Sequence, residues 1–201
     1  MLAGHAGDAD GAAQLLEDPD PSVRAAAIGA LARVGELGRA ALEIGVADPE
    51  PSVRRRTCEE LGRALGRPSV PAGVPDTGQC VALVLPLLDD HEPAVVESAA
   101  WALGEAGARD DAVVERLTLL ARSHNAPLCR EAAVAALGAL GDRRGLGAVL
   151  AALDDKPAVR RRAAVALAAF DDPLADAGLR RCLEDKDWQV RQAAEDLLRQ
   201  P

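Results

Sequence analysis

Apolar residues recur along this chain at a spacing typical of helices that bury one face. The clearest example is the segment PAVRRRAAVALAAF, which a proline opens. Its apolar stripe is formed by Val159, Ala163, Leu167 and Phe170. Five other segments repeat this pattern, so the sequence predicts six such helices, here called anchor helices. The first apolar residue of each stripe defines its anchor position: Val23, Val53, Val95, Cys129, Val159 and Val190.

The residues around each anchor position follow a fixed motif. A small residue stands four positions later: Ala27, Thr57, Ala99, Ala133, Ala163 and Ala194. A leucine stands eight positions later: Leu31, Leu61, Leu103, Leu137, Leu167 and Leu198. One such helix cannot hide its stripe alone, so neighbouring copies are expected to stack and cover one another.

The spacing of the copies predicts a helical solenoid. The anchor positions are 30, 42, 34, 30 and 31 residues apart, and a period near thirty with a helix in each unit is typical of such arrays. We expect one repeat domain over residues 1–201, in which a shorter leading helix precedes each anchor helix. The anchor helices are predicted near residues 21–34, 51–65, 93–106, 127–140, 157–170 and 187–199. Three prolines and three glycines in residues 66–79 predict an inserted loop, which accounts for the 42-residue interval.

The polar part of the motif predicts a ladder of ion pairs. An arginine follows the anchor position in five copies: Arg24, Arg54, Arg130, Arg160 and Arg191. Five positions before each anchor position stands an acidic residue, or a histidine in one copy: Asp18, Asp48, Asp90, His124, Asp154 and Asp185. Repeated in register, these side chains would form charge-assisted hydrogen bonds across stacked turns. A row of catalytic carboxylates is the alternative. Val96 and His124 interrupt the motif in neighbouring copies, so the ladder should be weakest there.

Composition narrows the functional classes. The chain is 49% hydrophobic but only 1% aromatic, which suits close helix packing better than a sheet. Its net charge of −9 argues against nucleic-acid binding. The first residues lack the features of a secretory signal, and no apolar stretch is long enough to cross a membrane. Four cysteines lie far apart and favour free thiols in the cytoplasm.

The repeated segments resemble HEAT repeats, in particular the short form found in phycobilisome-lyase-like proteins and bacterial adaptors. The resemblance is carried by DPDPSVRAAAIGALARVGE at residues 18–36 and LDDKPAVRRRAAVALAAF at residues 153–170. It implies an all-α solenoid of about six antiparallel hairpins forming a right-handed superhelix, with the anchor helices lining its concave side. It also implies a non-enzymatic scaffold that binds a protein partner. We expect a monomer without cofactor or metal, although assembly through the ends of the solenoid remains open.

Three enzyme classes with similar repeats provide alternatives. Deoxyhypusine hydroxylases bind two irons with several His-Glu pairs, whereas this chain has only His91-Glu92 and three histidines in all. HEAT-like DNA glycosylases use a basic face, which the acidic balance opposes. A bilin-lyase-like subunit would draw on a thiol such as Cys58 or Cys129. Because Cys129 occupies an anchor position, it is expected to be buried and inert.

The candidate binding site follows from the positions opposite the apolar stripe. The second and sixth residues after each anchor position point away from it. These positions include Arg55, Glu59, Glu97, Trp101, Glu131 and Arg161, and together with Glu105, which flanks Trp101, they form the predicted partner-binding patch. Trp101 would be its hot spot if neighbouring helices leave it exposed, and the sequence leaves that open. Trp188 is expected to cover the open end of the core. The arginine clusters 54–56, 143–144 and 160–162 are interpreted as a salt-bridged surface rather than a phosphate site.

Overall fold

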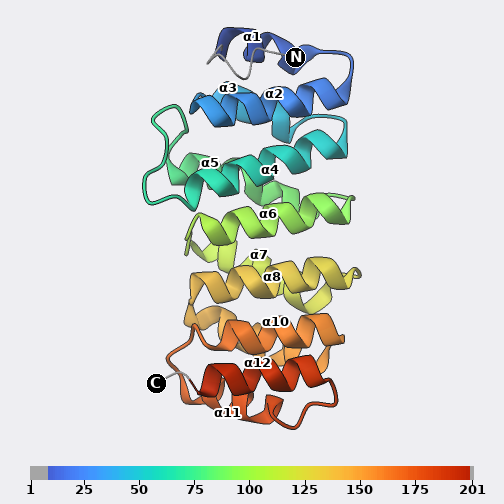
Figure 1. The fold of residues 1–201 in the computed structure, drawn as a ribbon, viewed down its shortest axis with the longest axis vertical. Helices are drawn as coiled ribbons and strands as arrows, with labels where there is room; N and C mark the ends of the chain where they lie inside the picture. Colours follow the sequence, from blue (N-terminus) through green and yellow to red (C-terminus); the bar gives the residue numbers. More distant parts are fainter. Residues whose placement is uncertain (1–8, 200–201) are drawn as a thin grey trace. The chain divides into compact units, whose positions relative to one another are not determined.

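The computed structural model describes residues 9–199, and within that range the chain is made of helices and turns without strands. Contacts divide the protein into two compact units, Met1–Ala106 (unit 1) and Gly107–Pro201 (unit 2). Each unit is a stack of three helical hairpins (Figure 1). The predicted all-α solenoid is therefore confirmed. That the units act as one repeat domain over residues 1–201 stays a prediction.

In unit 1 the anchor helices lie one beside the next, and the leading helices form a second layer. The anchor helices are α2 (Pro21–Val34), α4 (Pro51–Leu65) and α6 (Pro93–Glu105). The leading helices are α1 (Ala9–Gln14), α3 (Arg39–Val46) and α5 (Thr77–Val84), with 3-10 turns at Leu15–Glu17 and Leu85–Asp89.

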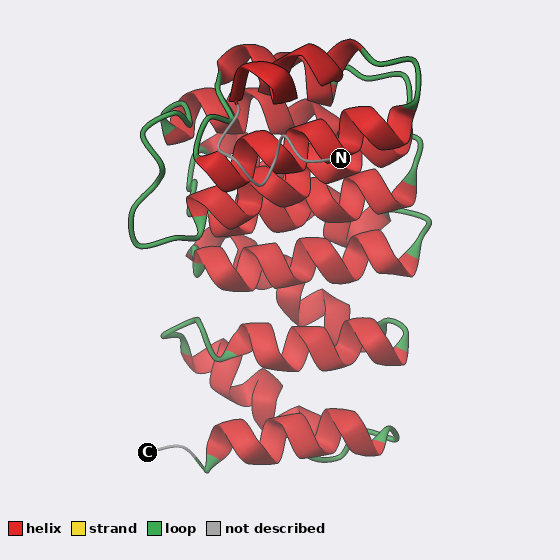
Figure 2. Ribbon diagram, turned by 45° about the horizontal axis from the view of Figure 1, so that its top comes forward, coloured by secondary structure: helices red, strands yellow, loops and turns green. Residues whose placement is uncertain are grey.

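Unit 2 repeats this two-layered arrangement of helices (Figure 2). Its anchor helices are α8 (Pro127–Leu140), α10 (Pro157–Leu167) and α12 (Trp188–Leu198). Its leading helices are α7 (Asp111–Ser123), α9 (Leu146–Ala151) and α11 (Pro173–Cys182). Helix α9 is flanked by 3-10 turns at Arg143–Gly145 and Ala152–Asp154.

Local sequence signals explain most helix boundaries. Proline occupies the first turn of five anchor helices, where its missing N–H costs nothing. Gly35 and Gly141 end α2 and α8 in the left-handed conformation, with φ of 80° and 60°. Helix α10 stops at Leu167, three residues before the predicted end. The backbone tightens into i→i−3 hydrogen bonds through Phe170, whose side chain is still buried.

The third hairpin of unit 1 begins earlier than the sequence suggested. Helix α5 starts at Thr77 because the Asp76 side chain accepts a hydrogen bond from the Gln79 N–H and caps it. Pro86 then lies in the 3-10 turn that follows α5, as expected from a proline that interrupts an α-helix. The loop before α5 lies against the turn that follows α2. A Cβ added at Gly73 would clash with the Gly35 carbonyl oxygen and would lie 3.0 Å from the Glu36 Cα.

The predicted stripes form the core of both units. The anchor positions from Val53 to Val190 are at most 1% exposed, and Val23 is half-buried. The small residues four positions later are all buried. The leucines eight positions later are 0–3% exposed from Leu31 to Leu167, whereas Leu198 is 39% exposed. Burial is therefore incomplete only in the first and last copies.

The arginine–aspartate ladder joins successive hairpins within each unit. In unit 1 the guanidinium groups of Arg24 and Arg54 bind the carboxylates of Asp48 and Asp90. Each arginine donates from Nε and Nη2 to both carboxylate oxygens at 2.7–2.9 Å. In addition, Nη1 of each arginine donates to a carbonyl in its own turn, Asp18 for Arg24 and Asp48 for Arg54. Each fork therefore ties two turns together.

Unit 2 has the same kind of ladder, but one of its predicted aspartates was wrong. Arg160 binds Asp185, as predicted. Arg130 binds Asp155 at 2.6 Å through both nitrogens, and not the predicted Asp154. Asp154 is the last residue of the 3-10 turn Ala152–Asp154. Asp155 is the first residue after that turn, as Asp18 and Asp90 are after their own 3-10 turns. The released Asp154 pairs with Arg181.

The two departures from the motif take other structural roles. Val96, which replaces an arginine on α6, is fully buried. His124, which replaces an aspartate before α8, accepts a hydrogen bond at Nδ1 from the Ala126 N–H, at 3.1 Å. The ladder of unit 1 thus runs through Asp90, and that of unit 2 begins at Arg130.

Loss of one ladder arginine should destabilise the protein strongly. The side chains of Arg54 and Asp90 are 9% and 5% exposed. Arg54→Ala would leave the Asp90 carboxylate buried and unpaired, so we expect a loss of about 3–5 kcal/mol in the free energy of unfolding. Urea titration followed by circular dichroism measures it. The neighbouring Arg55→Ala is the control. Its side chain is 50% exposed, and its effect should stay within about 0.5 kcal/mol. Equal effects of both substitutions would contradict the ladder.

The ladder also predicts acid sensitivity. Hydrogen bonds from Arg24, Arg130 and Arg160 lower the pKa of Asp48, Asp155 and Asp185 respectively. A carboxylate with a lowered pKa in the folded state stabilises the fold above its unfolded pKa of about 3.9. That stabilisation is lost as the pH falls through the folded pKa.

We therefore expect the urea midpoint to be steady near neutral pH and to fall steeply below about pH 4. Asp155→Asn should lower the midpoint at pH 7 and make the decline in acid shallower, because one proton-binding group is missing. A variant with an unchanged acid slope would contradict this assignment.

Candidate functional site

The predicted binding patch lies on the exposed face of the anchor helices but is divided between the two units. Arg55 and Glu59 lie on α4, and Glu97, Trp101 and Glu105 lie on α6, all in unit 1. Glu131 on α8 and Arg161 on α10 belong to unit 2. The first five residues therefore lie on two neighbouring helices of unit 1, whereas Glu131 and Arg161 lie in the other unit.

A pocket of about 350 Å³ between α4 and α6 contains four of these residues. It is lined by Arg55, Glu59, Arg63, Glu97, Ser98 and Trp101. Sequence reasoning missed Arg63 and Ser98. Arg63 lies one turn after Glu59 on the same helix face, a signal that the motif positions alone did not capture. Glu105 does not line the pocket. A Cβ added at Gly66 would clash with its carboxylate, so Glu105 lies against the end of α4.

Trp101 forms an aromatic wall of this pocket and remains 36% exposed. Its six-membered ring lies directly against α4, where a Cβ added at Gly62 would be only 2.5–3.0 Å from ring carbons. A real Cβ cannot approach so closely, so glycine at position 62 makes room for the indole. The ring is therefore supported on one side by backbone and is accessible from the pocket.

Charged side chains around Trp101 are largely neutralised by one another. Arg55 and Arg63 both approach Glu59, at 3.6 and 3.4 Å. Glu60 binds Arg56 at 2.7 Å and Arg63 at 3.1 Å. With the pairing of Arg54 to Asp90 in the ladder, this network gives every arginine of the cluster at residues 54–56 a carboxylate partner within the protein. In unit 2, Arg161 bonds to the Gln189 side chain, and Arg162 approaches Glu131 at 3.4 Å.

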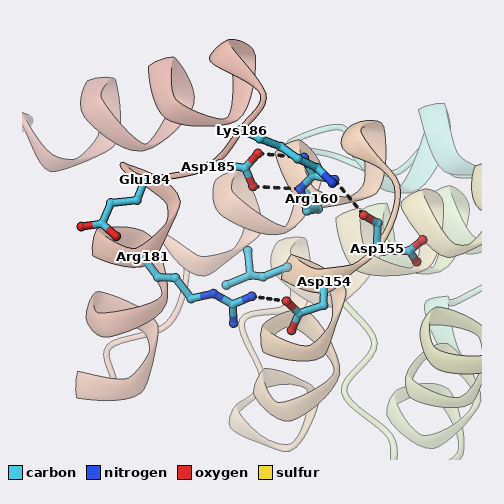
Figure 3. Close-up of a pocket in the computed structure, with 8 residues that line it drawn as sticks. Asp154, Asp155, Arg160, Arg181, Glu184, Asp185 and Lys186 are labelled. Atoms are coloured by element: carbon cyan, nitrogen blue, oxygen red, sulfur yellow. Dashed lines mark hydrogen bonds and ion pairs between the residues drawn. The ribbon is translucent and has the colours of Figure 1, made fainter.

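A second pocket, of about 370 Å³, lies at the turns of unit 2 and is strongly charged (Figure 3). The ladder pair Arg160–Asp185 and the pair Arg181–Asp154 span it. Lys186 and the carboxylates of Asp155 and Glu184 complete its lining, together with Leu153. Most of these charged side chains are paired with one another, so we interpret them as part of the ladder and not as a ligand site.

The remaining arginine cluster also bridges hairpins of unit 2. Arg143 binds Asp172 at 2.8 Å, and Arg144 binds both Asp142 and Asp111. The hydrogen bond from the Arg144 side chain lowers the pKa of Asp142 to about 2. Ion pairs therefore occur in all three arginine clusters, although Arg54 and Arg160 are buried and Arg161 bonds to a neutral glutamine.

An apolar groove of about 240 Å³ lies between α8 and α10 in unit 2. Its walls are mainly alanine and glycine, with Val165 45% exposed and Arg162 at the rim. The anchor-helix faces therefore differ between units, with an aromatic, charged pocket in unit 1 and a shallow apolar groove in unit 2.

The chemistry available to the cysteines is limited by burial. Cys58, Cys80, Cys129 and Cys182 form no disulfide and are buried. Burial raises the pKa of the Cys58 thiol to about 12 and that of Cys80 to about 11. Both thiols are thus protonated near neutral pH, and a thiol is a poor nucleophile in that state.

Metal-binding clusters and membrane-spanning helices are both absent from the described part of the chain. Residues 9–199 contain no group of three or more His, Cys, Asp or Glu side chains arranged to hold a metal ion. Over the same residues, no helix combines the length and apolar character required to traverse a bilayer.

Charge is distributed unequally along the chain. Residues 1–106 contain 8 basic and 17 acidic side chains and account for the whole net charge of −9. Residues 107–201 contain 15 of each and are neutral. The units therefore present different electrostatic surfaces to a partner.

The chain is similar to solved repeat proteins over nearly its whole length. One is an engineered protein with a TM-score of 0.64 and 20% identity, covering 95% of each chain. Another is a designed armadillo repeat protein in complex with a (KR)4 peptide, with a TM-score of 0.63, 16% identity, and 94% and 97% coverage. A third is from the CpcE–CpcF complex of the phycocyanin lyase of Nostoc sp., with a TM-score of 0.65, 22% identity, and 94% and 75% coverage.

At these identities the similarity establishes the fold alone. No curated protein sequence matches the chain. The family model for HEAT repeats matches residues 39–138 and 114–199, and a second HEAT repeat model matches residues 12–37. Together these matches cover nearly all of the described helices, and the chain belongs to the HEAT repeat family.

Proposed function

We propose that this protein is a non-enzymatic adaptor that binds a partner protein through the exposed face of its anchor helices. The pocket at Trp101 is the principal contact. A HEAT-repeat scaffold supplies the rigid framework, since each helix is held by its neighbours in the stack. The proposal assigns partner binding to one particular surface of this scaffold.

The observation that carries the proposal is the supported but accessible indole of Trp101. Binding hot spots are enriched in tryptophan and arginine and lie in well-packed pockets. The Trp101 ring is packed against Gly62, so little side-chain freedom would be lost on binding. The pocket of about 350 Å³ has room for one side chain of a partner.

The charged rim supports specificity more than affinity. Arg55, Arg63 and Glu59 form a chain of exposed ion pairs beside the indole. Such rim charges orient a partner and exclude wrongly charged ones, while adding little binding energy. Glu131 and Arg161 in unit 2 are proposed as further contacts, independent of the pocket.

The absence of catalysis is also part of the proposal. A bilin-lyase-like subunit would use a nucleophilic or accessible thiol, but Cys58 and Cys129 are completely buried. The raised pKa values of Cys58 and Cys80 add to this argument. Purified protein carrying a bound pigment would favour the lyase alternative. Four cysteines that form no disulfide favour a reducing compartment, so we propose a cytoplasmic location.

The test begins with affinity capture from the native cell, identification of the partner by mass spectrometry, and calorimetric titration with that partner. We expect Trp101→Ala to weaken binding at least about 30-fold, the value for a hot spot of about 2 kcal/mol. The melting temperature should fall less than after truncation of a fully buried side chain, because Trp101 is already 36% exposed.

The matched control is Trp188→Ala. Trp188 is 64% exposed and lies on α12 in the other unit, so its loss should leave partner affinity unchanged. A large fall in melting temperature with unchanged binding in Trp101→Ala would show that Trp101 serves packing and would refute the proposed pocket.

A further inference from the structure

The last arginine of the ladder is held in its own turn like the others, but no carboxylate of the described residues lies across from it. Arg191 Nη1 donates to the Asp185 carbonyl of its own turn at 2.7 Å. Arg54 and Arg160 make the same bond in their turns, at 2.8 and 2.9 Å. Those arginines also place Nε and Nη2 on the aspartate of the following hairpin. Among residues 9–199, no carboxylate occupies that position for Arg191.

The first aspartate of the ladder shows the complementary arrangement. Asp18 Oδ1 accepts the N–H of Asp20 at 2.8 Å. Asp48 and Asp185 accept the N–H two residues later at the same distance. Those two carboxylates also receive the guanidinium of the preceding hairpin. No guanidinium from residues 9–199 reaches the Asp18 carboxylate. Its turn is nevertheless held in the ladder geometry, because Arg24 Nη1 donates to its carbonyl.

Core positions are incompletely covered at the same two ends. Leu198 is 39% exposed, against 0–3% for its five counterparts. Val23 is half-buried, whereas the later anchor positions are at most 1% exposed. Trp188, expected to cover the end of the core, is instead 64% exposed beside Arg191. Each end thus combines one open half of an ion pair with accessible apolar surface.

We propose that a second copy of this chain stacks head to tail on the first, with Arg191 of one copy binding Asp18 of the other. The pair would repeat the fork geometry of the internal ladder, and both halves are already held in position by their own turns. Little ordering of the two turns is therefore required on association. The contact is heterologous, so it extends to further copies or closes into a ring.

The distribution of charge favours this orientation. Association through two copies of unit 1 would bring together two halves that each carry a charge of −9. Head-to-tail stacking instead places the acidic unit 1 of one copy against the neutral unit 2 of another. The proposal replaces the monomer expected from the sequence and is independent of the pocket at Trp101.

The test is sedimentation velocity of the 201-residue chain from micromolar to millimolar concentration. The weight-average mass should rise above the 20.8 kDa of one chain as concentration increases. Asp18→Arg and Arg191→Asp, each alone, should weaken self-association at least tenfold. The combination of both substitutions in one chain should restore it, because the pair is then reversed. Added salt should weaken association in the wild type.

Two control substitutions make the same kinds of charge reversal at residues outside the proposed contact. Glu43→Arg on α3 and Arg180→Asp on α11 alter exposed residues and should leave self-association unchanged. Thermal melting checks that every variant is folded. A wild-type mass that stays at 20.8 kDa at all concentrations overturns the proposal and leaves these ends to a different partner. Self-association that neither end substitution alters overturns the assigned contact.

Discussion

The structure depends on a guanidinium group that belongs to one hairpin and is shared with the next. In each complete rung, an arginine holds its own turn through a carbonyl and the neighbouring turn through a bidentate carboxylate pair. Burying such charges is costly unless their hydrogen bonds are satisfied, and here they are. The geometry can form only when two hairpins have the correct offset. The ladder therefore fixes the register of an apolar interface that aliphatic side chains alone would define loosely.

The core is simple because the repeat is regular. Small residues four positions after each anchor let helices approach closely, and the leucines fill the remaining space between layers. Cys129 takes the place of valine without effect on burial, since a thiol is similar in size and behaves as a small hydrophobe. Stability is expected to be distributed over nearest-neighbour contacts rather than gathered at one centre.

The sequence was sufficient for the repeat because the same residue types recur at fixed distances. The sequence was not sufficient to predict where individual helices and 3-10 turns end. Asp154 and Asp155 are adjacent and chemically identical, but Asp154 lies within the 3-10 turn and Asp155 is the first residue after it, which is the residue that binds Arg130. Ala168 and Ala169 favour helix, so nothing in them signalled that α10 ends at Leu167. The sequence predicted which helix face carries the candidate site, but it did not predict that this face contains a pocket. Only the packing of α6 on α4 reveals that Trp101 and Arg63 share a pocket.

The contact between Gly62 and Trp101 couples two positions 39 residues apart in the sequence. A methyl group at position 62 would occupy the volume that the indole fills, so the two side chains can change only in a compensating way. Among related chains, a larger residue at 62 should accompany a smaller one at 101. The position of the indole in this pocket therefore depends on the lack of a side chain at position 62.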